Sequence, residues 1–126
     1  GFKATRESLS FQENLMHIGF AIDWQCQSLI MGGEAKSWQT DTIFNDFDRS
    51  KEQLILVIDN TFKETIASIQ SMDSPTLNER VDYFGLDRST RQILMLLCDH
   101  ISHHRGQRVV CLRLNGIEPP RYVIYQ

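Results

Sequence analysis

The chain has 126 residues, a length that suits one domain and leaves little room for a second. Hydrophobic residues make up 41% of it and charged residues 23%, as is ordinary for a globular protein, and the formal net charge is -3. No cluster of lysine and arginine marks a nucleic-acid partner, and no apolar run approaches the roughly 18 residues that indicate a membrane span.

The number and spacing of the cysteines and the N-terminal residues indicate the cellular compartment of the protein. The chain has three cysteines, an odd number, and no two of them have the CxxC spacing. This pattern favours a reducing compartment over a disulfide framework. The N-terminal residues do not have the pattern of a signal peptide. We therefore expect a cytoplasmic protein.

The first long helix is predicted from about Ser10 to Met31. Ser10 and Glu13 have the spacing of a capping box, in which each residue's side chain accepts a hydrogen bond from the other's backbone N–H. Gly32 and Gly33 follow, and glycine ends a helix readily because it adopts the left-handed conformation without steric cost. The apolar residues of this helix recur on one face: Phe11, Leu15, Ile18, Ile22 and Leu29.

The second long helix is predicted from about Ser50 to Met72. Ser50 and Gln53 form another capping-box pattern, and Pro75 forbids continuation at the other end. The apolar stripe of this helix comprises Leu54, Ile58, Phe62, Ile66 and Ile69. The preceding residues, 34–49, are predicted to form an ordered connection that packs over the bundle. They carry three large aromatic side chains: Trp38, Phe44 and Phe47.

The third long helix is predicted from about Ser89 to Leu114. Ser89 opens a third capping box, and Gly116 provides the C-terminal stop. The residues before this helix, 81–85, have the composition of a short strand and turn. The C-terminal residues 122–125 are also β-prone, so the two segments are candidates to pair with each other.

These elements predict an all-α fold in which three long helices pack roughly antiparallel as an up-down bundle. Gly106 lies within the third helix, where glycine costs about 1 kcal/mol relative to alanine. That cost suggests that another helix approaches closely at this position. The residues expected in the core are Ile18, Ile58, Phe62, Ile93 and Leu97.

One face of the third helix combines apolar ends with a polar middle. Steps of four and three residues trace the face that a helix turns toward the centre of a bundle. This face comprises Ile93, Leu97, His100, His104, Gln107, Cys111 and Leu114. Interior polar groups need partners, since burying each one unpaired costs roughly 1–3 kcal/mol. Residues four apart lie on one face of a helix, so the imidazoles of His100 and His104 can converge on one metal ion.

A third ligand is expected from another helix, and His17 is the candidate because it lies midway along the first one. Imidazole nitrogen suits zinc, nickel, copper and iron(II). The alternative is a set of core histidines that are satisfied by hydrogen bonds with protein groups. His103 lies beside the face that carries His100 and His104, and we interpret it as a flanking residue or a hydrogen-bonding partner.

Two further residues are weaker candidates. Gln107 lies one turn beyond His104 and could orient a ligating histidine, or could equally form a hydrogen bond between helices. Arg105 could bind a substrate carboxylate, although an exposed or locally paired arginine is the commoner role.

The run from His100 to Gln107, an HxxxH motif followed directly by Arg-Gly-Gln, resembles the DinB/YfiT-like superfamily. His17 on the first helix and residues 116–120 extend the similarity. The resemblance implies one divalent metal ion, zinc or nickel before iron, held by His17, His100 and His104. It also implies a four-helix bundle with long connections. Because only three long helices are predicted here, the first helix of the family is expected before Gly1.

The resemblance also implies a function. Members of the superfamily look like metal-dependent transferases that join thiols such as bacillithiol or mycothiol to electrophiles, while others act as isomerases or in ergothioneine synthesis. Three imidazoles leave a coordination position open, as in catalytic zinc sites. We therefore expect a homodimeric thiol transferase or hydrolase that acts on a small molecule, with no nucleic-acid or membrane partner. The alternative is a non-catalytic bundle that binds metal or mediates dimerisation.

Overall fold

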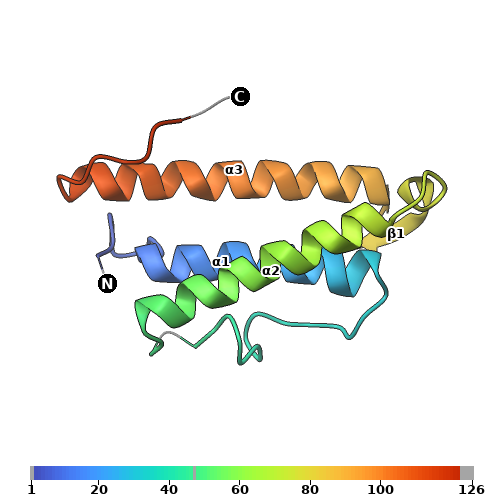
Figure 1. The fold of residues 1–126 in the computed structure, drawn as a ribbon, viewed down its shortest axis with the longest axis horizontal. Helices are drawn as coiled ribbons and strands as arrows, with labels where there is room; N and C mark the ends of the chain where they lie inside the picture. The colour runs from blue at the N-terminus through green and yellow to red at the C-terminus, as the bar shows by residue number, and fades with distance from the viewer. Residues whose placement is uncertain (1, 47, 123–126) are drawn as a thin grey trace.

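The computed structural model describes residues 2–46 and 48–122, and three long helices dominate them (Figure 1). None of the described helices is long and apolar enough to cross a lipid bilayer. The elements are α1 (Phe11–Asp23), the π-helical segment η1 (Trp24–Ile30), α2 (Lys51–Ser71), the 3-10 turn η2 (Thr76–Asn78), β1 (Arg80–Tyr83), β2 (Leu86–Ser89) and α3 (Thr90–Leu114).

The predicted helix ends are confirmed. Ser10 Oγ accepts a hydrogen bond from the Glu13 backbone N–H, and Glu13 Oε2 accepts one from the Ser10 N–H at 2.6 Å. The other two capping boxes pair Ser50 with Gln53 and Ser89 with Gln92. Gly32 has the left-handed φ of 69° expected of a helix stop. The π-helical geometry of the last part of the first helix is the one feature here that the apolar pattern did not indicate.

The helices do not all alternate in direction. In Figure 1, α3 runs opposite to both α1 and α2, as expected, whereas α1 and α2 run the same way. The connection across residues 31–50 makes this possible. An extended chain covers about 3.3 Å per residue and a helix rises 1.5 Å per residue, so this connection is long enough to return along the whole bundle.

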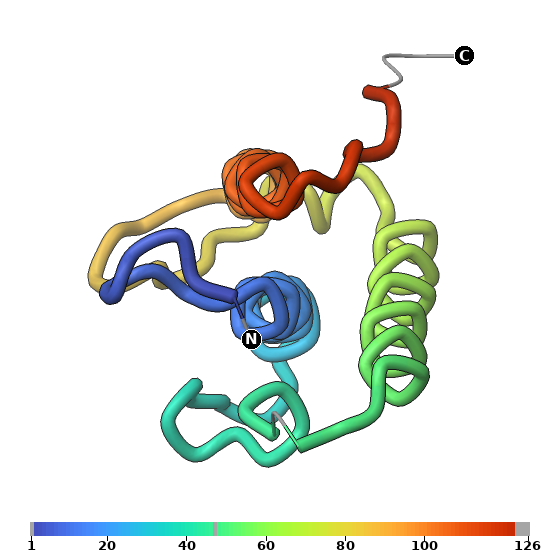
Figure 2. The backbone as a smooth tube through the Cα atoms, turned by 90° about the vertical axis from the view of Figure 1, so that its left-hand side faces the viewer, coloured from blue at the N-terminus to red at the C-terminus, as the bar shows by residue number. Residues whose placement is uncertain are grey.

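The hydrophobic core lies on two sides of α1, which packs between α2 and α3 (Figure 2). One buried cluster joins Met16, Phe20, Phe44 and Leu54, with Trp38 packed against it. The other joins Ile18, Ile22 and Leu97. The expectation that residues 34–49 pack over the bundle is confirmed through Trp38 and Phe44, while Phe47 lies outside the described residues.

The apolar stripe predicted for α2 is only partly correct. Leu54 is buried, Ile58 and Phe62 are half-buried, but Ile66 is 51% exposed and Ile69 is 38% exposed. The side chains that α2 buries instead are Thr61 and Thr65. Small hydroxyl-bearing residues let α2 approach α1 closely, and Thr61 Oγ1 satisfies its own polarity locally by donating to the Val57 carbonyl at 2.8 Å.

Two expectations for α3 are wrong. Leu114 is 60% exposed, because the C-terminal end of α3 extends past the start of α1 and has no helix opposite it (Figure 1). Gly106 does not mark a close approach within the described residues, since a Cβ atom built there would meet no atom within 4 Å. Of the two glycines within the long helices, the one crowded by a neighbour is Gly19 on α1. A Cβ there would lie 2.6 Å from Ile58 Cδ1 and 2.7 Å from Phe44 Cε1.

The strand predicted at residues 81–85 corresponds to β1, but its partner is β2, with Arg80 opposite Ser89. Phe84 and Gly85 connect the strands with φ angles of 55° and 77°. Two consecutive positive φ angles are the geometry of a tight β-hairpin, which closes more easily than a pairing with the distant C-terminus. Most of the partner segment that we expected, residues 123–125, lies outside the described residues.

The two helix glycines are expected to respond to substitution in opposite directions. Gly19→Ala should destabilise the fold by about 1–3 kcal/mol, because the added Cβ would overlap the buried ring of Phe44. Gly106→Ala should stabilise it by up to about 1 kcal/mol, because alanine is the better helix former and its methyl group meets nothing. Urea denaturation of the two variants and the wild type measures both effects, and a loss of stability in Gly106→Ala would contradict the structure.

Candidate metal centre

Three histidines from two helices meet between α1 and α3. His17 lies in the middle of α1, while His100 and His104 lie one turn apart on α3. Their ring centroids are 4.4–5.1 Å apart, and one nitrogen from each ring lies within 4.8 Å of the other two. The structure thus brings together the three residues that the sequence predicted as ligands.

All three rings are favoured in the neutral form. Burial, reinforced by the neighbouring histidines, lowers the pKa of His100 from 6.5 to about 4. Burial also lowers the pKa of His17, with a smaller contribution from His104. The pKa of His104 is lowered mainly by burial, against the opposing effect of its hydrogen bond with Gln107. A neutral imidazole has the free lone pair that binding to a metal requires.

The chemistry of this group fits a divalent metal ion. His100 Nε2 is buried and has no hydrogen-bond partner among the described residues. A buried polar atom left in this state costs roughly 1–3 kcal/mol, and a metal ion would remove that cost. The group contains no carboxylate or thiol among the described residues, so all three donors are neutral nitrogens. Such a donor set suits zinc or nickel and leaves a coordination position open.

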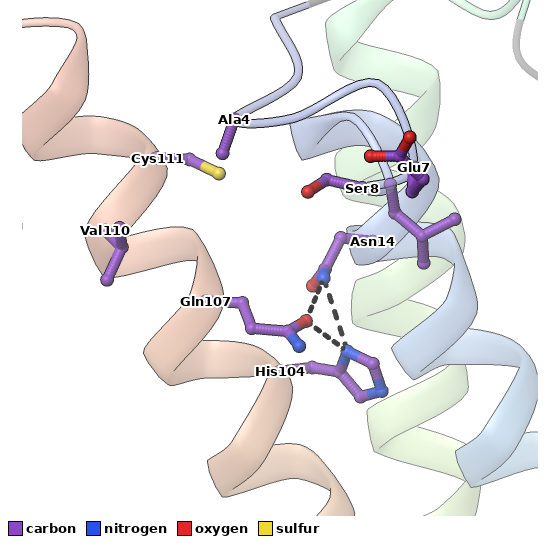
Figure 3. Close-up of a pocket in the computed structure, with 9 residues that line it drawn as sticks. Ala4, Glu7, Ser8, Asn14, His104, Gln107, Val110 and Cys111 are labelled. Carbon is purple, nitrogen blue, oxygen red and sulfur yellow. Dashed lines mark hydrogen bonds between the residues drawn. The ribbon is translucent and has the colours of Figure 1, made fainter.

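The side-chain amides of Asn14 and Gln107 form a hydrogen-bond network with His104 (Figure 3). Asn14 Nδ2 lies 2.7 Å from Gln107 Oε1 and 3.2 Å from His104 Nδ1. Gln107 Oε1 lies 2.9 Å from His104 Nδ1. The other end of the Gln107 amide, Nε2, donates to His103 Nε2 at 3.0 Å. Gln107 therefore contacts the histidine group through a hydrogen bond with His104, whereas the hydrogen bond of His103 is with Gln107, and His103 does not belong to the group itself.

A cavity of about 390 Å³ lies beyond this network, between α3 and the residues that precede α1 (Figure 3). Its volume falls in the range that accommodates small molecules. Polar atoms of Asn14, His104 and Gln107 form one side, and apolar side chains form much of the rest. The cavity is lined by Ala4, Glu7, Ser8, Leu9, Asn14, His104, Gln107, Val110 and Cys111.

The remaining candidate, Arg105, is directed elsewhere. Its guanidinium stacks on the ring of Tyr122, 4.4 Å from the centroid, in a hollow that contains no histidine. The ring of Trp38, in the connection before α2, contacts the ring of His17 edge to face, with centroids 5.5 Å apart. Sequence reasoning gave no role to Asn14. The available signal was its position three residues before His17, which places both on one helical face.

Comparison with known proteins connects this arrangement to a family. A segment of 45 residues is 40% identical to YrdA, an uncharacterized protein of Bacillus subtilis (strain 168), and covers 36% of this chain and 27% of YrdA. The fold resembles the crystal structure of a DinB-like protein, YjoA, from Bacillus subtilis, with a TM-score of 0.73 at 22% identity. That match covers 99% of this chain and 80% of YjoA. The sequence model of the DinB family matches residues 4–124. The chain therefore belongs to the DinB family.

Proposed function

We propose that this protein is a divalent-metal-dependent enzyme of small-molecule chemistry, with His17, His100 and His104 as the metal ligands. The observation that carries the proposal is the convergence of three neutral imidazoles from two helices, one of which has a buried nitrogen with no partner among the described residues. A purely structural core would not need three histidines in mutual contact, because apolar residues fill such a space at lower cost.

The reaction that we propose is transfer of a low-molecular-weight thiol to an electrophilic carbon, with hydrolysis of the same kind of electrophile as a related possibility. When bound, a divalent ion lowers the pKa of a water or thiol ligand toward neutrality and polarises an electrophile. In the transfer, the thiol loses its proton, a carbon–sulfur bond forms and the leaving group departs. The thiols that we propose are of the bacillithiol and mycothiol class, because the histidine motif resembles the superfamily whose members look like transferases of these thiols.

The chain's own residues would bind and orient the reactants. The cavity beside His104 has the size for one small molecule, and Leu9 and Val110 offer apolar contacts to its carbon skeleton. The amides of Asn14 and Gln107 lie on the side of the cavity nearest His104. A substrate held there would lie close to the histidine group, which is the arrangement that proximity catalysis requires.

A conjugation assay on protein of known metal content tests the proposal. The purified protein is first analysed for zinc, nickel and iron, then stripped with chelator and reloaded with each metal. Thiols including bacillithiol and mycothiol are offered with a chromogenic electrophile, and a parallel arm contains the electrophile with water alone. We expect conjugation that requires the metal and is lost in His104→Ala. Equal rates with and without metal would refute the proposed enzyme.

The second candidate is a non-catalytic bundle that binds metal or assembles through its helices. Exposed apolar residues on α2 favour it: Ile55, Ile66 and Ile69 are 54%, 51% and 38% exposed. Apolar side chains grouped on one helix are typical of an interaction surface, and a homodimer is the assembly that we propose for it. Stoichiometric metal without conjugation or hydrolysis of any reagent would support this candidate over the enzyme.

A further inference from the structure

We infer that Asn14 and Gln107 are positioning residues that hold the proton of His104 on Nδ1 and so leave Nε2 free as the ligand atom. The inference rests on the proposed metal site, because it assigns which atom of His104 serves that site. The hydrogen bonds that carry it join protein groups alone, so the tautomer can be measured separately from metal binding.

The orientation of the Gln107 amide follows from its neighbours. Asn14 Nδ2 is only a donor, so the atom 2.7 Å away from it must be the acceptor oxygen of Gln107. The amide nitrogen of Gln107 is then directed to His103 Nε2, which accepts its hydrogen at 3.0 Å. Turning the Gln107 amide over would place two donors against each other at the Asn14 contact. The contact with Asn14 therefore fixes the orientation of the Gln107 amide, and His103 Nε2, which can donate or accept, adapts to it.

The position of the His104 proton follows next. The separations between Asn14 Nδ2, Gln107 Oε1 and His104 Nδ1 are 2.7, 2.9 and 3.2 Å, a nearly equilateral triangle. Seen from Asn14, the other two atoms are about 60° apart, half the roughly 120° between the hydrogens of an amide group. Asn14 therefore donates to the nearer atom, the Gln107 oxygen. His104 Nδ1 faces that same oxygen at 2.9 Å, and the contact is attractive only if Nδ1 carries a hydrogen.

The burial of Asn14 adds an independent observation. Asn14 is 5% exposed, and its Oδ1 is buried without a hydrogen-bond partner among the described residues. Such an atom lowers stability, so an apolar side chain of similar shape would suit the position as well or better if packing were its only role. The buried amide is explained by its donor, which orients Gln107. Hydrogen-bond partners that orient metal-binding histidines in this way typically change metal affinity 10–100-fold.

Measurement of the His104 tautomer tests the assignment directly. Nitrogen-15 NMR of the metal-free protein at about pH 8, where the imidazoles are neutral, distinguishes a protonated from an unprotonated ring nitrogen. We expect the wild type to carry the His104 hydrogen on Nδ1. Gln107→Met, which keeps the length of the side chain but removes the acceptor, should shift the population toward Nε2–H. A wild-type protein with the hydrogen on Nε2 would overturn the inference.

Zinc affinity, measured by competition with a chromophoric chelator, provides the second test. Gln107→Met should weaken zinc binding about 10–100-fold and Asn14→Leu about tenfold, while Gln107→Glu, which keeps the acceptor, should bind within about threefold of the wild type. Asn14→Leu should also melt at or above the wild-type temperature, an effect that a merely structural asparagine would not produce.

A matched control separates this inference from the proposed site. Gln70→Met makes the same chemical change at an exposed position of α2 and should bind zinc like the wild type. If zinc binding requires His17, His100 and His104 but is unchanged in Gln107→Met, the positioning role is refuted and the metal site stands. If no metal binds, the NMR result still decides the tautomer.

Discussion

Replacing His104 with alanine is expected to lower the affinity for Zn²⁺ more than 100-fold and to make the melting temperature insensitive to chelator. Loss of a hydrogen-bonding partner of a metal ligand already costs 10–100-fold, and loss of one ligand in three removes more. His104 has the two shortest ring contacts of the group, with centroids 4.7 Å from His17 and 4.4 Å from His100, and its removal leaves two rings without the third donor.

The link to stability follows from where the ligands lie. The group joins α1 to α3, so a bound ion stabilises the folded state by mass action. At a free metal concentration one hundred times Kd the effect is about 2.7 kcal/mol, which in a domain of this size raises Tm on the order of 10 °C. Chelator should remove that increment from the wild type. The metal-free variant should remain folded, because Ile93 and Leu97 still bury α3 against α1.

Thermal melts with and without chelator, on protein whose metal content is measured beforehand, test this expectation. His103→Ala is the matched control, because it removes a neighbouring imidazole that lies outside the group. Identical melts for metal-loaded wild type with and without chelator would refute the link between metal and fold. That outcome would leave a metal held by a scaffold that does not depend on it, which is compatible with catalysis.

The second large effect is the resistance of metal binding to acid. Protonated imidazole does not bind a metal, and three unperturbed histidines with a pKa of 6.5 would lose affinity on the order of 10³-fold between pH 7 and pH 5.5. Here the pKa of His100 is lowered to about 4, and those of His17 and His104 are also lowered. The protein rings therefore stay neutral at lower pH. The loss over the same interval should be far smaller, and the steep fall should come at lower pH.

The same shifts predict the direction of the pH effect on the metal-free fold. Between 6.5 and the lowered pKa values the unfolded chain binds more protons than the folded one, so stability falls as pH drops through this window. Zinc titrations at several pH values and an NMR titration of the histidine rings measure both effects. The chain in concentrated guanidinium is the control, with histidine pKa values near 6.5. A zinc affinity that falls with the third power of proton concentration from pH 6.5 downward would contradict the structure.

Much of the site could be predicted from sequence because its ligands follow a local rule. His100 and His104 are four residues apart on one helix, and this spacing alone places both on one face. His17 was proposed as the third ligand from its position midway along the first helix, and the resemblance of the motif supported that choice. Asn14 was not identified, because its role depends on Gln107, which is 93 residues away in the chain. Hydrogen bonds between distant residues have no periodicity that a sequence reveals.

Local sequence signals were sufficient to place the helix ends. Capping boxes at Ser10, Ser50 and Ser89 and glycines at positive φ act within a few residues, so the tertiary structure does not change them. Only the tertiary structure decided which face of α2 is buried, since Thr61 and Thr65 pack inward while Ile66 remains exposed. The hydrophobic effect is non-directional, so it does not by itself select the buried face of α2. That choice depends on how closely α1 can approach each face.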